Sequence, residues 1–534
     1  MSNKHTKHSN AHSTMKAILQ PKQITGKPMN SKIIHVSIAA PGTGKTMAAI
    51  SAIPGMLGHG KKILYVAPTL ALADQVFKDI RRICSSLEPI IIDSRCEGSA
   101  EANLNKMLNP KESSHLIICQ HITFQKCSTK HLRDWTIIID ELPMPISLRH
   151  MAFDQVQLKR LDLIEIIDNQ IKIKKNKYED IKNEVATFNK SKSQKYNQID
   201  TTLSPAAQDI YNAVLSKLPV FADAYHSANE KIVIRIIEEY GFFERFHMAQ
   251  EVHLLSATLK GSLFDWFARA NGFTYAHSNF AQSTTDNVKD VTIYPMLSDK
   301  NHCSRGVLDS VDGASNDGCK VLQSMANLID QQLTNQEYCL MFAYKWGKNT
   351  HSRKFIQCKI DSRGLNSFTD THCAFTAFHG NPNPLAYKSF EYIAKKYNRS
   401  TDELQNAWKF TYKLEMTLQN VFRTSLRSKT IDKPVKLYVQ DNEVANFLKN
   451  MYLPNAKIDD SLAKTYKEKK KPGPTPHPER EKAITMLQAG MKQAVVARAT
   501  KLDKMTICNY AKAIRQIKAG ENSASSTHTL EQWL

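Results

Sequence analysis

The chain has 534 residues, of which 42% are hydrophobic. It is too long for a single core, so we expect two to four domains. The formal net charge of +21 favours a polyanionic partner such as nucleic acid, because Lys and Arg gain affinity by displacing counterions from phosphates. The ten cysteines include no C-x-x-C pair, and no apolar run is long enough to span a membrane. These features argue against a zinc ribbon, a disulfide framework or a membrane partner, and favour a cytoplasmic protein.

The first structural elements are expected directly after a basic N-terminal segment. Residues 1–30 contain few apolar side chains, so a disordered arm is expected there. The β-branched segment 33–38 predicts a buried parallel strand. The sequence AAPGTGKT follows at 39–46, and a helix is expected to begin at its end and to stop near Pro54-Gly55.

Residues 39–46 have the composition of a phosphate-binding loop, with Ala39 where the usual pattern has its first glycine. In such a loop, backbone N–H groups surround phosphate oxygens, Lys45 reaches the outer phosphates and Thr46 binds Mg²⁺. The helix that follows would direct its positive N-terminal dipole at the phosphates. The predicted nucleotide-binding residues are Pro41, Gly42, Thr43, Gly44, Lys45 and Thr46.

Strands and helices alternate up to about Leu148, which predicts an α/β fold with a parallel sheet covered on both faces. Strands are expected at 63–67, in HLIICQHITF and in WTIIIDELP. The last of these ends in Asp140 and Glu141. A nucleotide-hydrolysing site needs one carboxylate for the metal and one to orient the attacking water, so we assign Asp140 to Mg²⁺ and Glu141 to the water.

The alternation is interrupted at 151–250 and resumes at EVHLLSATL, which predicts a first domain at 31–289 with an insertion. Within the insertion, LIEIIDNQIKIKK predicts a hairpin and EDIKNEVATF a helix. A second α/β domain is expected at 290–450, with strands in YCLMFAYK, CAFTAF and VKLYVQD. A basic, Pro-rich linker at 451–477 and a polar tail at 519–534 flank a small helical unit.

Taken in order, these motifs resemble those of the superfamily 2 helicases of the DEAD/DEAH-like type. APGTGKT resembles motif I, APTLALADQ motif Ia, DEL motif II and LLSATL motif III. LMFAYK resembles motif IV, DSRGLNSF motif V and QNVFRTSLR motif VI. The resemblance implies two RecA-like domains, with ATP in the cleft between them and a single strand of nucleic acid across their upper face.

The resemblance also implies roles for residues of the later motifs. Gln419 would contact the nucleotide or the catalytic water, and Arg423 would neutralise charge on the γ-phosphate from the second domain. Arg427 stands one residue later than in the family pattern, and Phe422 replaces its glycine. Because one residue rotates a helical side chain by about 100°, we expect Arg427 to point away from the phosphate and to contribute less. The residues implied in nucleotide binding and coupling are Gly364, Ser256, Ala257, Thr258 and Arg363.

The insertion is placed like the arch insertion of the iron–sulphur helicases, and four cysteines precede motif II. These are Cys84, Cys96, Cys119 and Cys127. A cluster needs thiolates that converge from short loops, whereas Cys119 lies in an apolar strand and none of the spacings is close. We therefore expect free cysteines rather than cluster ligands.

Residues 478–518 predict three short helices, at 479–489, 493–500 and 504–514. They resemble the helix-turn-helix domain of Hin-type invertases and resolvases, preceded by a basic arm suited to a minor groove. The third helix would then lie in the major groove of duplex DNA, and a protein-interaction module is the alternative. The predicted DNA-binding residues are Lys504, Thr506, Asn509, Tyr510 and Lys512.

Together the motifs predict an ATP- and Mg²⁺-dependent DNA helicase or translocase. Single-stranded DNA would bind across the two RecA-like domains and duplex DNA at the helix-turn-helix. By analogy this architecture suits a replication or recombination factor of a mobile element. Two alternatives remain: an RNA helicase, and a DNA-binding regulator that uses ATP as a switch without unwinding.

Overall fold

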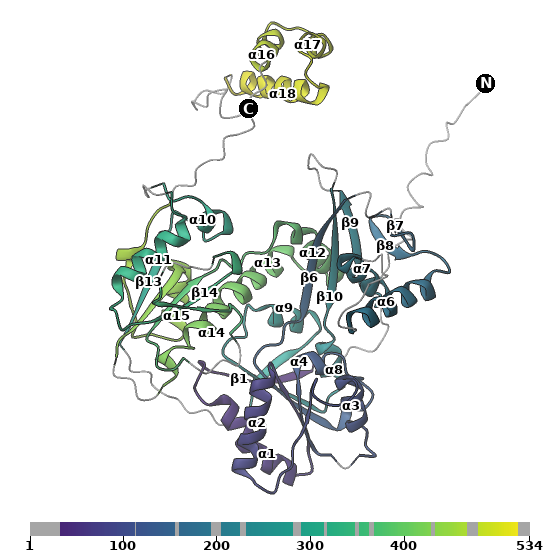
Figure 1. Ribbon diagram of the computed structural model, residues 1–534, viewed down its shortest axis with the longest axis vertical. Coiled ribbons are helices and arrows are strands. Elements are labelled where there is room, and N and C mark those ends of the chain that lie inside the picture. The colour runs from purple at the N-terminus through teal and green to yellow at the C-terminus, as the bar shows by residue number, and fades with distance from the viewer. Residues whose placement is uncertain are drawn as a thin grey trace, which may run out of the picture. The chain divides into compact units, whose positions relative to one another are not determined.

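The computed structural model describes residues 32–112, 114–154, 158, 160–193, 204–224, 231–280, 290–313, 318–347, 352–362, 368–428, 433–466 and 479–521. The chain divides into two units, Met1–Tyr466 and Lys467–Leu534, which we describe separately (Figure 1). Within the first unit, we call residues 32–280 domain 1 and residues 290–466 domain 2. The predicted arm, the motif V residues Arg363, Gly364 and Asn366, and most of the predicted tail lie outside the described residues.

Domain 1 is built on a seven-stranded sheet in the order β12-β1-β11-β5-β2-β4-β3. Its strand pairs are parallel, which confirms the predicted parallel α/β fold. The central strand β5 is buried at every residue, as expected for a sheet with both faces covered. The strands are β1 (Ile33–Ile38), β2 (Lys62–Ala67), β3 (Ile90–Ile92), β4 (Leu116–Gln120), β5 (Trp135–Asp140), β11 (Glu251–Ser256) and β12 (Thr274–His277). The helices are α1 (Lys45–Gly58), α2 (Leu70–Ile83), α3 (Ala100–Met107), α4 (His121–Phe124), α8 (Phe242–Met248) and α9 (Leu263–Ala270).

Helix α1 is longer than the sequence predicts. It continues through Pro54 to Gly58, so the predicted end near Pro54-Gly55 is wrong. Proline lacks one backbone N–H, but its fixed φ is compatible with a helix, and the turn beyond it still forms. The buried side chains Ala49, Ile50 and Ile53 hold this helix on the sheet.

In chain order, the segment between β5 and β11 forms a separate five-stranded antiparallel sheet in the order β6-β10-β9-β8-β7. The predicted hairpin is confirmed as β7 and β8, whose turn residues Asp168 and Asn169 have φ of 49° and 63°. The sheet spans 146–239, whereas α8 packs on the core of domain 1, so the predicted insertion bounds of 151 and 250 are displaced at both ends. The elements are β6 (Ile146–Asp154), β7 (Ile164–Ile167), β8 (Gln170–Ile173), α6 (Tyr178–Ser193), α7 (Pro205–Leu215), β9 (Val220–Ala224) and β10 (Lys231–Glu239).

Domain 2 is built on a six-stranded parallel sheet in the order β15-β14-β16-β17-β13-β18. The strands predicted from the three quoted segments are confirmed as β14, β16 and β17. The sheet extends past residue 450 because β18 pairs with β13, so 451–466 is not the predicted linker. The strands are β13 (Val291–Leu297), β14 (Cys339–Ala343), β15 (Phe355–Cys358), β16 (Cys373–Ala377), β17 (Val435–Asp441) and β18 (Lys457–Ile458). The helices are α10 (Arg305–Asp309), α11 (Val321–Gln332), α12 (Tyr387–Lys396), α13 (Thr401–Lys409), the π-helix η4 (Phe410–Glu415), α14 (Met416–Val421), the 3₁₀ turn η5 (Ser425–Arg427) and α15 (Asn442–Met451).

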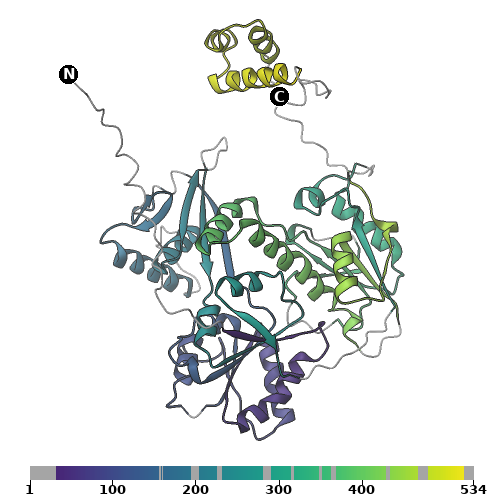
Figure 2. The same cartoon turned by 180° about the vertical axis from the view of Figure 1, so that it is seen from behind.

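Helices α12 and α13 join the core of domain 1, although the chain enters and leaves them from domain 2. Their buried residues Phe390, Ile393, Leu404 and Ala407 belong to the same hydrophobic cluster as strands β4 and β5. Figures 1 and 2 show both helices, in green, beside the blue strands β6 and β10. The two domains are therefore held together by a helical hairpin as well as by the chain between them.

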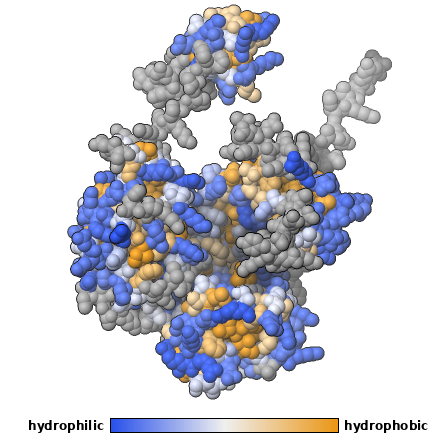
Figure 3. Space-filling model, viewed as in Figure 1, coloured by the Kyte–Doolittle hydropathy of each residue, from blue (hydrophilic) through white to orange (hydrophobic). Residues whose placement is uncertain are grey.

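The second unit consists, in its described part, of the helices α16 (Arg480–Gln488), α17 (Gln493–Thr500) and α18 (Lys504–Glu521). Ala483, Val496, Leu502 and Ile507 form its small core. On the face seen in Figure 3, hydrophobic residues gather in patches between hydrophilic ones. Among the described helices of either unit, none has the length and apolar character needed to cross a membrane.

Candidate nucleotide site

The loop between β1 and α1 has the backbone geometry that its glycines allow. Gly42 and Gly44 adopt φ of 85° and 90°, values that residues other than glycine rarely adopt. At its start, the Ala39 N–H donates to the Ser256 carbonyl at 3.1 Å, and this anchors the loop to β11. Thr43 donates its hydroxyl to the Ala40 carbonyl at 2.9 Å. The loop therefore presents the N-terminus of α1 at the carboxyl ends of the strands, where anions bind.

Lys45 is the first residue of α1, and its ammonium group lies over the loop. Its Nζ donates to the carbonyls of Ala39 and Ala40 at 2.5 and 2.8 Å. Burial lowers the pKa of Lys45 to about 8, and the nearby carboxylates of Asp140 and Glu141 oppose this shift only in part. A phosphate group in the loop would supply the negative charge that this buried ammonium group lacks.

Asp140 ends β5 and receives two hydroxyl donors on the same oxygen. Its Oδ2 accepts hydrogen bonds from Thr46 Oγ1 at 2.7 Å and from the Tyr65 hydroxyl at 2.8 Å. Burial raises the pKa of Asp140, and the two hydroxyl groups oppose that shift. The sequence analysis did not identify Tyr65 as a site residue. The signal was available, because Tyr65 carries a hydroxyl group among the aliphatic residues that follow Lys62 in strand β2.

Glu141 follows in an unusual backbone conformation, with φ of 62°. Its N–H donates to the Leu255 carbonyl at 2.8 Å, which extends the pairing of β5 with β11 by one residue. A non-glycine residue in this region costs energy and is tolerated where the surrounding structure imposes it, often at functional sites. Glu141 lines the same cavity as Lys45.

The oxygen donors of this site suit Mg²⁺ bound together with a nucleotide. Thr46 and Asp140 already contact each other, and hydroxyl and carboxylate oxygens are ligands of hard cations. No cluster of three His, Cys, Asp or Glu side chains that could hold a metal occurs among the described residues. Where a nucleotide binds, its phosphates would complete the coordination of Mg²⁺.

Domain 2 completes the cavity opposite the loop. Gln419 on α14 and Arg427 at the end of η5 line a cavity of about 240 Å³ that also contacts Lys45, Asp140 and Glu141. The Arg427 side chain packs against Gly42, where an added Cβ would lie 3.3 Å from Arg427 Cγ. The expectation that Arg427 points away is therefore wrong. Helix α14 ends at Val421, so a rotation of 100° per residue does not apply to the turn that follows.

Arg423 lies behind this cavity rather than on its wall. It is 3% exposed, and its Nη2 is 3.9 Å from Glu141 Oε1. In this position Arg423 contacts the carboxylate of Glu141, which we expect to orient the attacking water. Arg423 is not among the residues that line the cavity. The structure thus brings both arginines to the site, with Arg427 on the cavity wall and Arg423 beside Glu141.

The motif III residues lie at the junction of the two domains. Ser256 and Ala257 line the cavity, and Ser256 Oγ accepts a hydrogen bond from the Thr258 N–H at 3.2 Å. Ala257 also belongs to the hydrophobic cluster of the domain 2 sheet. The motif V residues Arg363 and Gly364 are outside the described part of the chain, so the structure places neither of them.

The predicted DNA-binding residues share helix α18 but differ in exposure. Lys504, Asn509 and Lys512 are exposed, whereas Tyr510 packs against the small core. Asp503 precedes the helix and caps it by accepting two hydrogen bonds from Thr506: the Thr506 N–H donates to Asp503 Oδ1 at 2.9 Å and its hydroxyl donates to Oδ2. The local contacts of Thr506 and Tyr510 indicate that they support the helix, and three side chains extend from it freely into solvent.

Among the described residues, no three of the four cysteines before β5 come together in a group that could hold a metal ion. Cys119 and Cys127 are buried, and Cys84 and Cys96 are partly buried, all as free thiols. Burial raises the pKa of Cys127 to about 11, which disfavours the thiolate that a metal would need.

The N-terminal part of the chain is similar in sequence to a known protein family. Residues 11–157 match the family model of the DEAD/DEAH box helicase, and no curated protein matches the chain by sequence. Among solved structures, the chain is similar to the DEAD-box helicase Mss116 bound to ssRNA and UDP-BeF, with 13% identity over 91% of this chain and 83% of that chain and a TM-score of 0.30. It is similar to the DUF1998 helicase MrfA bound to DNA, with 10% identity over 80% of this chain and 48% of that chain and a TM-score of 0.28. A variant of S. cerevisiae Dbp5 bound to RNA and ADP BeF3 shares 9% identity over 86% of this chain and 90% of that chain, with a TM-score of 0.30.

The family match covers the phosphate-binding loop, the β2 segment with Tyr65 and the acidic pair that ends β5. These are the parts that bind and hydrolyse a nucleotide in such enzymes. The similarity to the DEAD/DEAH box helicase family therefore covers residues 11–157, which include the phosphate-binding loop and the acidic pair of this site.

Proposed function

We propose that this chain is an ATP- and Mg²⁺-dependent DNA helicase or translocase. One observation carries the proposal: Gln419 and Arg427 of domain 2 line the same cavity as Lys45, Asp140 and Glu141 of domain 1. Because groups from both domains surround the phosphates, binding and hydrolysis of ATP change the contacts between the domains. Such a change can move a nucleic acid strand that both domains hold.

In this mechanism the loop N–H groups and Lys45 bind the phosphates, and Thr46 and Asp140 hold the metal. Mg²⁺ would neutralise the charge that develops on the transferred phosphoryl group. Glu141 orients the attacking water. Arg427 stabilises the γ-phosphate, and Arg423 positions the Glu141 carboxylate from 3.9 Å.

The preference for DNA is supported by the second unit. Residues 467–534 contain thirteen Lys or Arg against six Asp or Glu, and α18 exposes Lys504, Asn509 and Lys512 on a compact three-helix core. This composition suits a helix-turn-helix that inserts its third helix into a major groove and adds phosphate contacts. The names of the similar structures include complexes with RNA and with DNA, so they do not discriminate between the two.

The decisive test compares ATPase rates of the full chain without nucleic acid and with single-stranded DNA, duplex DNA and RNA. We expect the largest stimulation by single-stranded DNA, together with displacement of a labelled strand from a partial duplex. Lys45→Ala should weaken ATP binding and turnover, whereas Glu141→Gln should retain binding and lose turnover. Stimulation by RNA alone would reverse the assignment, and parental turnover by Glu141→Gln would refute the role of the acidic pair.

A further inference from the structure

Domain 2 contacts the segment that connects β11 to α9 in domain 1 at three points. This segment, Ala257 to Leu263, begins at the nucleotide cavity and ends at the first residue of α9. The resemblance already implies a coupling role for the motif III residues of this segment, which we call the coupling loop. We propose that Tyr452 and Thr411 are positioning residues that link the place of this loop to the distance between the domains. The inference rests on the proposed function, because it names the residues that connect ATP hydrolysis to strand binding.

The first contact is made by Tyr452, which follows α15. Its hydroxyl donates to the Ala257 carbonyl at 2.8 Å, directly beside the nucleotide cavity. The Tyr452 ring packs edge-to-face on Phe447 at 5.6 Å, and Phe447 packs in the same way on Phe410 at 5.7 Å. This row of rings fixes the direction of the hydroxyl, so the hydrogen bond depends on where domain 2 stands.

The second and third contacts lie at the other end of the loop. The Leu263 N–H, which opens α9 and has no partner within its own helix, donates to Thr411 Oγ1 at 2.8 Å in a buried position. Gly261, with φ of 86°, lies against the Phe410 ring, and an added Cβ there would be 3.5 Å from the ring edge. Two side chains of η4 therefore hold the loop where it enters the helix.

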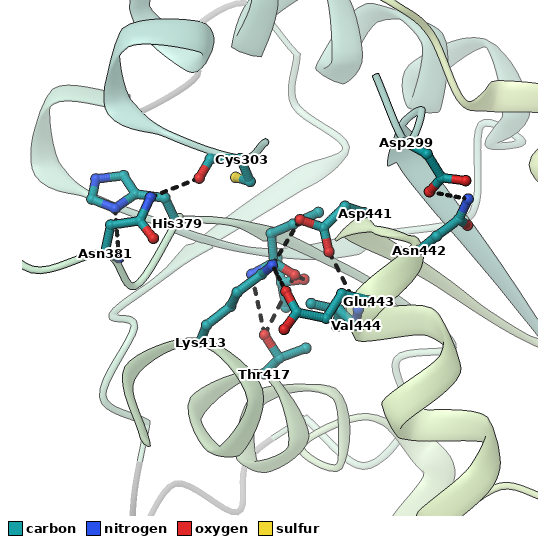
Figure 4. A network of polar contacts seen from close by, with 12 residues as sticks. Asp299, Cys303, His379, Asn381, Lys413, Thr417, Asp441, Asn442, Glu443 and Val444 are labelled. Atoms are coloured by element: carbon teal, nitrogen blue, oxygen red, sulfur yellow. Dashed lines mark hydrogen bonds and ion pairs between the residues drawn. The ribbon is translucent and has the colours of Figure 1, made fainter. Parts of the chain in front are cut away.

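The π-helix η4, which carries Thr411, is bound to the domain 2 sheet by a buried ion pair. Lys413 donates from Nζ to Asp441 Oδ2 at 2.8 Å and to Glu443, at the carboxyl end of β17 (Figure 4). The backbone at Gly380 also approaches η4 so closely that a Cβ added at Gly380 would lie 2.7 Å from the backbone nitrogen of Lys413. The π-helix is thus fixed on one side to the sheet and on the other to the coupling loop.

The same π-helix continues into α14, which carries Gln419. A small cavity of about 20 Å³ contacts Leu263, Thr411 and Gln419 together, and Gln419 also lines the nucleotide cavity. The coupling loop is therefore connected to the nucleotide at Ala257 and, through Thr411, at Gln419. If the domains separate, either the hydrogen bonds of Tyr452 and Thr411 break or the loop follows domain 2. In both cases the contacts or the position of the motif III backbone change.

The test uses three variants of the full chain. Tyr452→Phe removes the hydroxyl, Thr411→Val removes the acceptor of the Leu263 N–H without changing the side-chain shape, and Thr411→Ser retains that acceptor as the matched control. We expect single-strand-stimulated ATPase to fall at least fivefold in the first two variants. Unstimulated turnover and the KM for ATP should stay within twofold of the parent, and Thr411→Ser should resemble the parent. An unchanged stimulation ratio, or an equal fall of both rates with a lowered melting temperature, would overturn the proposal.

A second measurement separates this inference from the proposed function. In amide hydrogen exchange without nucleic acid, a non-hydrolysable ATP analogue should protect residues 257–263 in the parent and in Thr411→Ser, but much less in Thr411→Val. If the parent shows this protection but no nucleic acid stimulates its ATPase, the proposed function fails and the coupling loop stands. If protection is equal in all variants, the coupling loop is refuted whatever the ATPase rates are.

Discussion

At the scale of single residues, Tyr65 is one of two groups that orient the Asp140 carboxylate. Its hydroxyl and that of Thr46 both donate to Asp140 Oδ2. When Thr46 turns its oxygen towards Mg²⁺, Tyr65 remains as the donor that orients Asp140. We therefore expect Tyr65→Phe to raise the Mg²⁺ concentration needed for half-maximal ATPase about fivefold, with turnover at saturating Mg²⁺ within twofold of the parent.

The matched control is Tyr275→Phe. The Tyr275 hydroxyl also donates to a carboxylate, Asp265 Oδ1, at 3.0 Å, but neither residue lines the nucleotide cavity. Mg²⁺-dependent binding of a fluorescent ATP analogue provides a readout without turnover. Identical Mg²⁺ dependence in Tyr65→Phe and Tyr275→Phe would show that the hydroxyl of Tyr65 does not position Asp140.

The two arginines give a second prediction at this scale. Arg427 packs on the phosphate-binding loop, so Arg427→Ala should lower turnover on the order of a thousandfold with ATP binding largely intact. Arg423 is not among the residues that line the cavity, and its Nη2 is 3.9 Å from Glu141 Oε1, so Arg423→Ala should cost less. Single-turnover ATPase rates of the two variants decide the order. A normal Arg427→Ala with an inactive Arg423→Ala would restore the order expected from the sequence.

The site residues that could be predicted from sequence are those whose geometry is local. Lys45 and Thr46 follow a loop whose positive φ values require glycine, and Asp140 and Glu141 follow a buried strand. The place of Arg427 could not be predicted, because it depends on where α14 ends. Tyr452 and Thr411 belong to no motif, and only their contacts across the domains reveal them.

At the scale of elements, the parallel strands β1, β2, β4, β5, β11, β14, β16 and β17 were predictable, because each contains a short apolar run. The helical hairpin α12–α13 was not, because its apolar face fits a core built from residues far away in the sequence. The bounds of the antiparallel sheet were also missed. Its first strand β6 follows the acidic pair after only a few residues, and composition alone does not separate it from domain 1.

The contact between α12 and the antiparallel sheet yields the prediction at this scale. Asp223 on β9 accepts hydrogen bonds from Arg235 Nε on β10 and from Lys388 Nζ on α12, the latter at 3.0 Å. Arg235 is buried, so Asp223→Asn would leave a buried cation without its counterion. We expect the free energy of unfolding to fall by about 3 kcal/mol, measured by urea denaturation.

Lys388→Met is the control for that measurement. Its ammonium group is largely exposed, so its loss should cost less than about 1 kcal/mol. Equal effects of the two substitutions would mean that the buried pair of Asp223 and Arg235 does not stabilise the junction between the hairpin and the sheet.

At the scale of the whole molecule, domains 1 and 2 share a cavity and a hydrophobic core, whereas the three-helix unit forms a separate body. A motor that is fixed at the α12–α13 hairpin can still change its contacts at the cavity, because the two junctions involve different elements. The second unit would then determine where on DNA this motor acts, through contacts independent of ATP.

This separation predicts that a chain ending at residue 466 keeps strand-stimulated ATPase and loses affinity for duplex DNA. The catalytic groups and the coupling loop lie entirely in the retained part, so turnover should stay within twofold of the parent. In the full chain, Lys504→Ala combined with Lys512→Ala should reduce the slope of log K against log salt for duplex binding by about 2, because each lysine that neutralises a phosphate contributes about 0.9. Fluorescence anisotropy at several salt concentrations measures the affinity of the shortened chain for duplex DNA and the salt slope of the double variant. If the shortened chain binds duplex DNA as tightly as the parent and the slope does not change, α18 makes no phosphate contacts, and the three-helix unit must bind a protein instead.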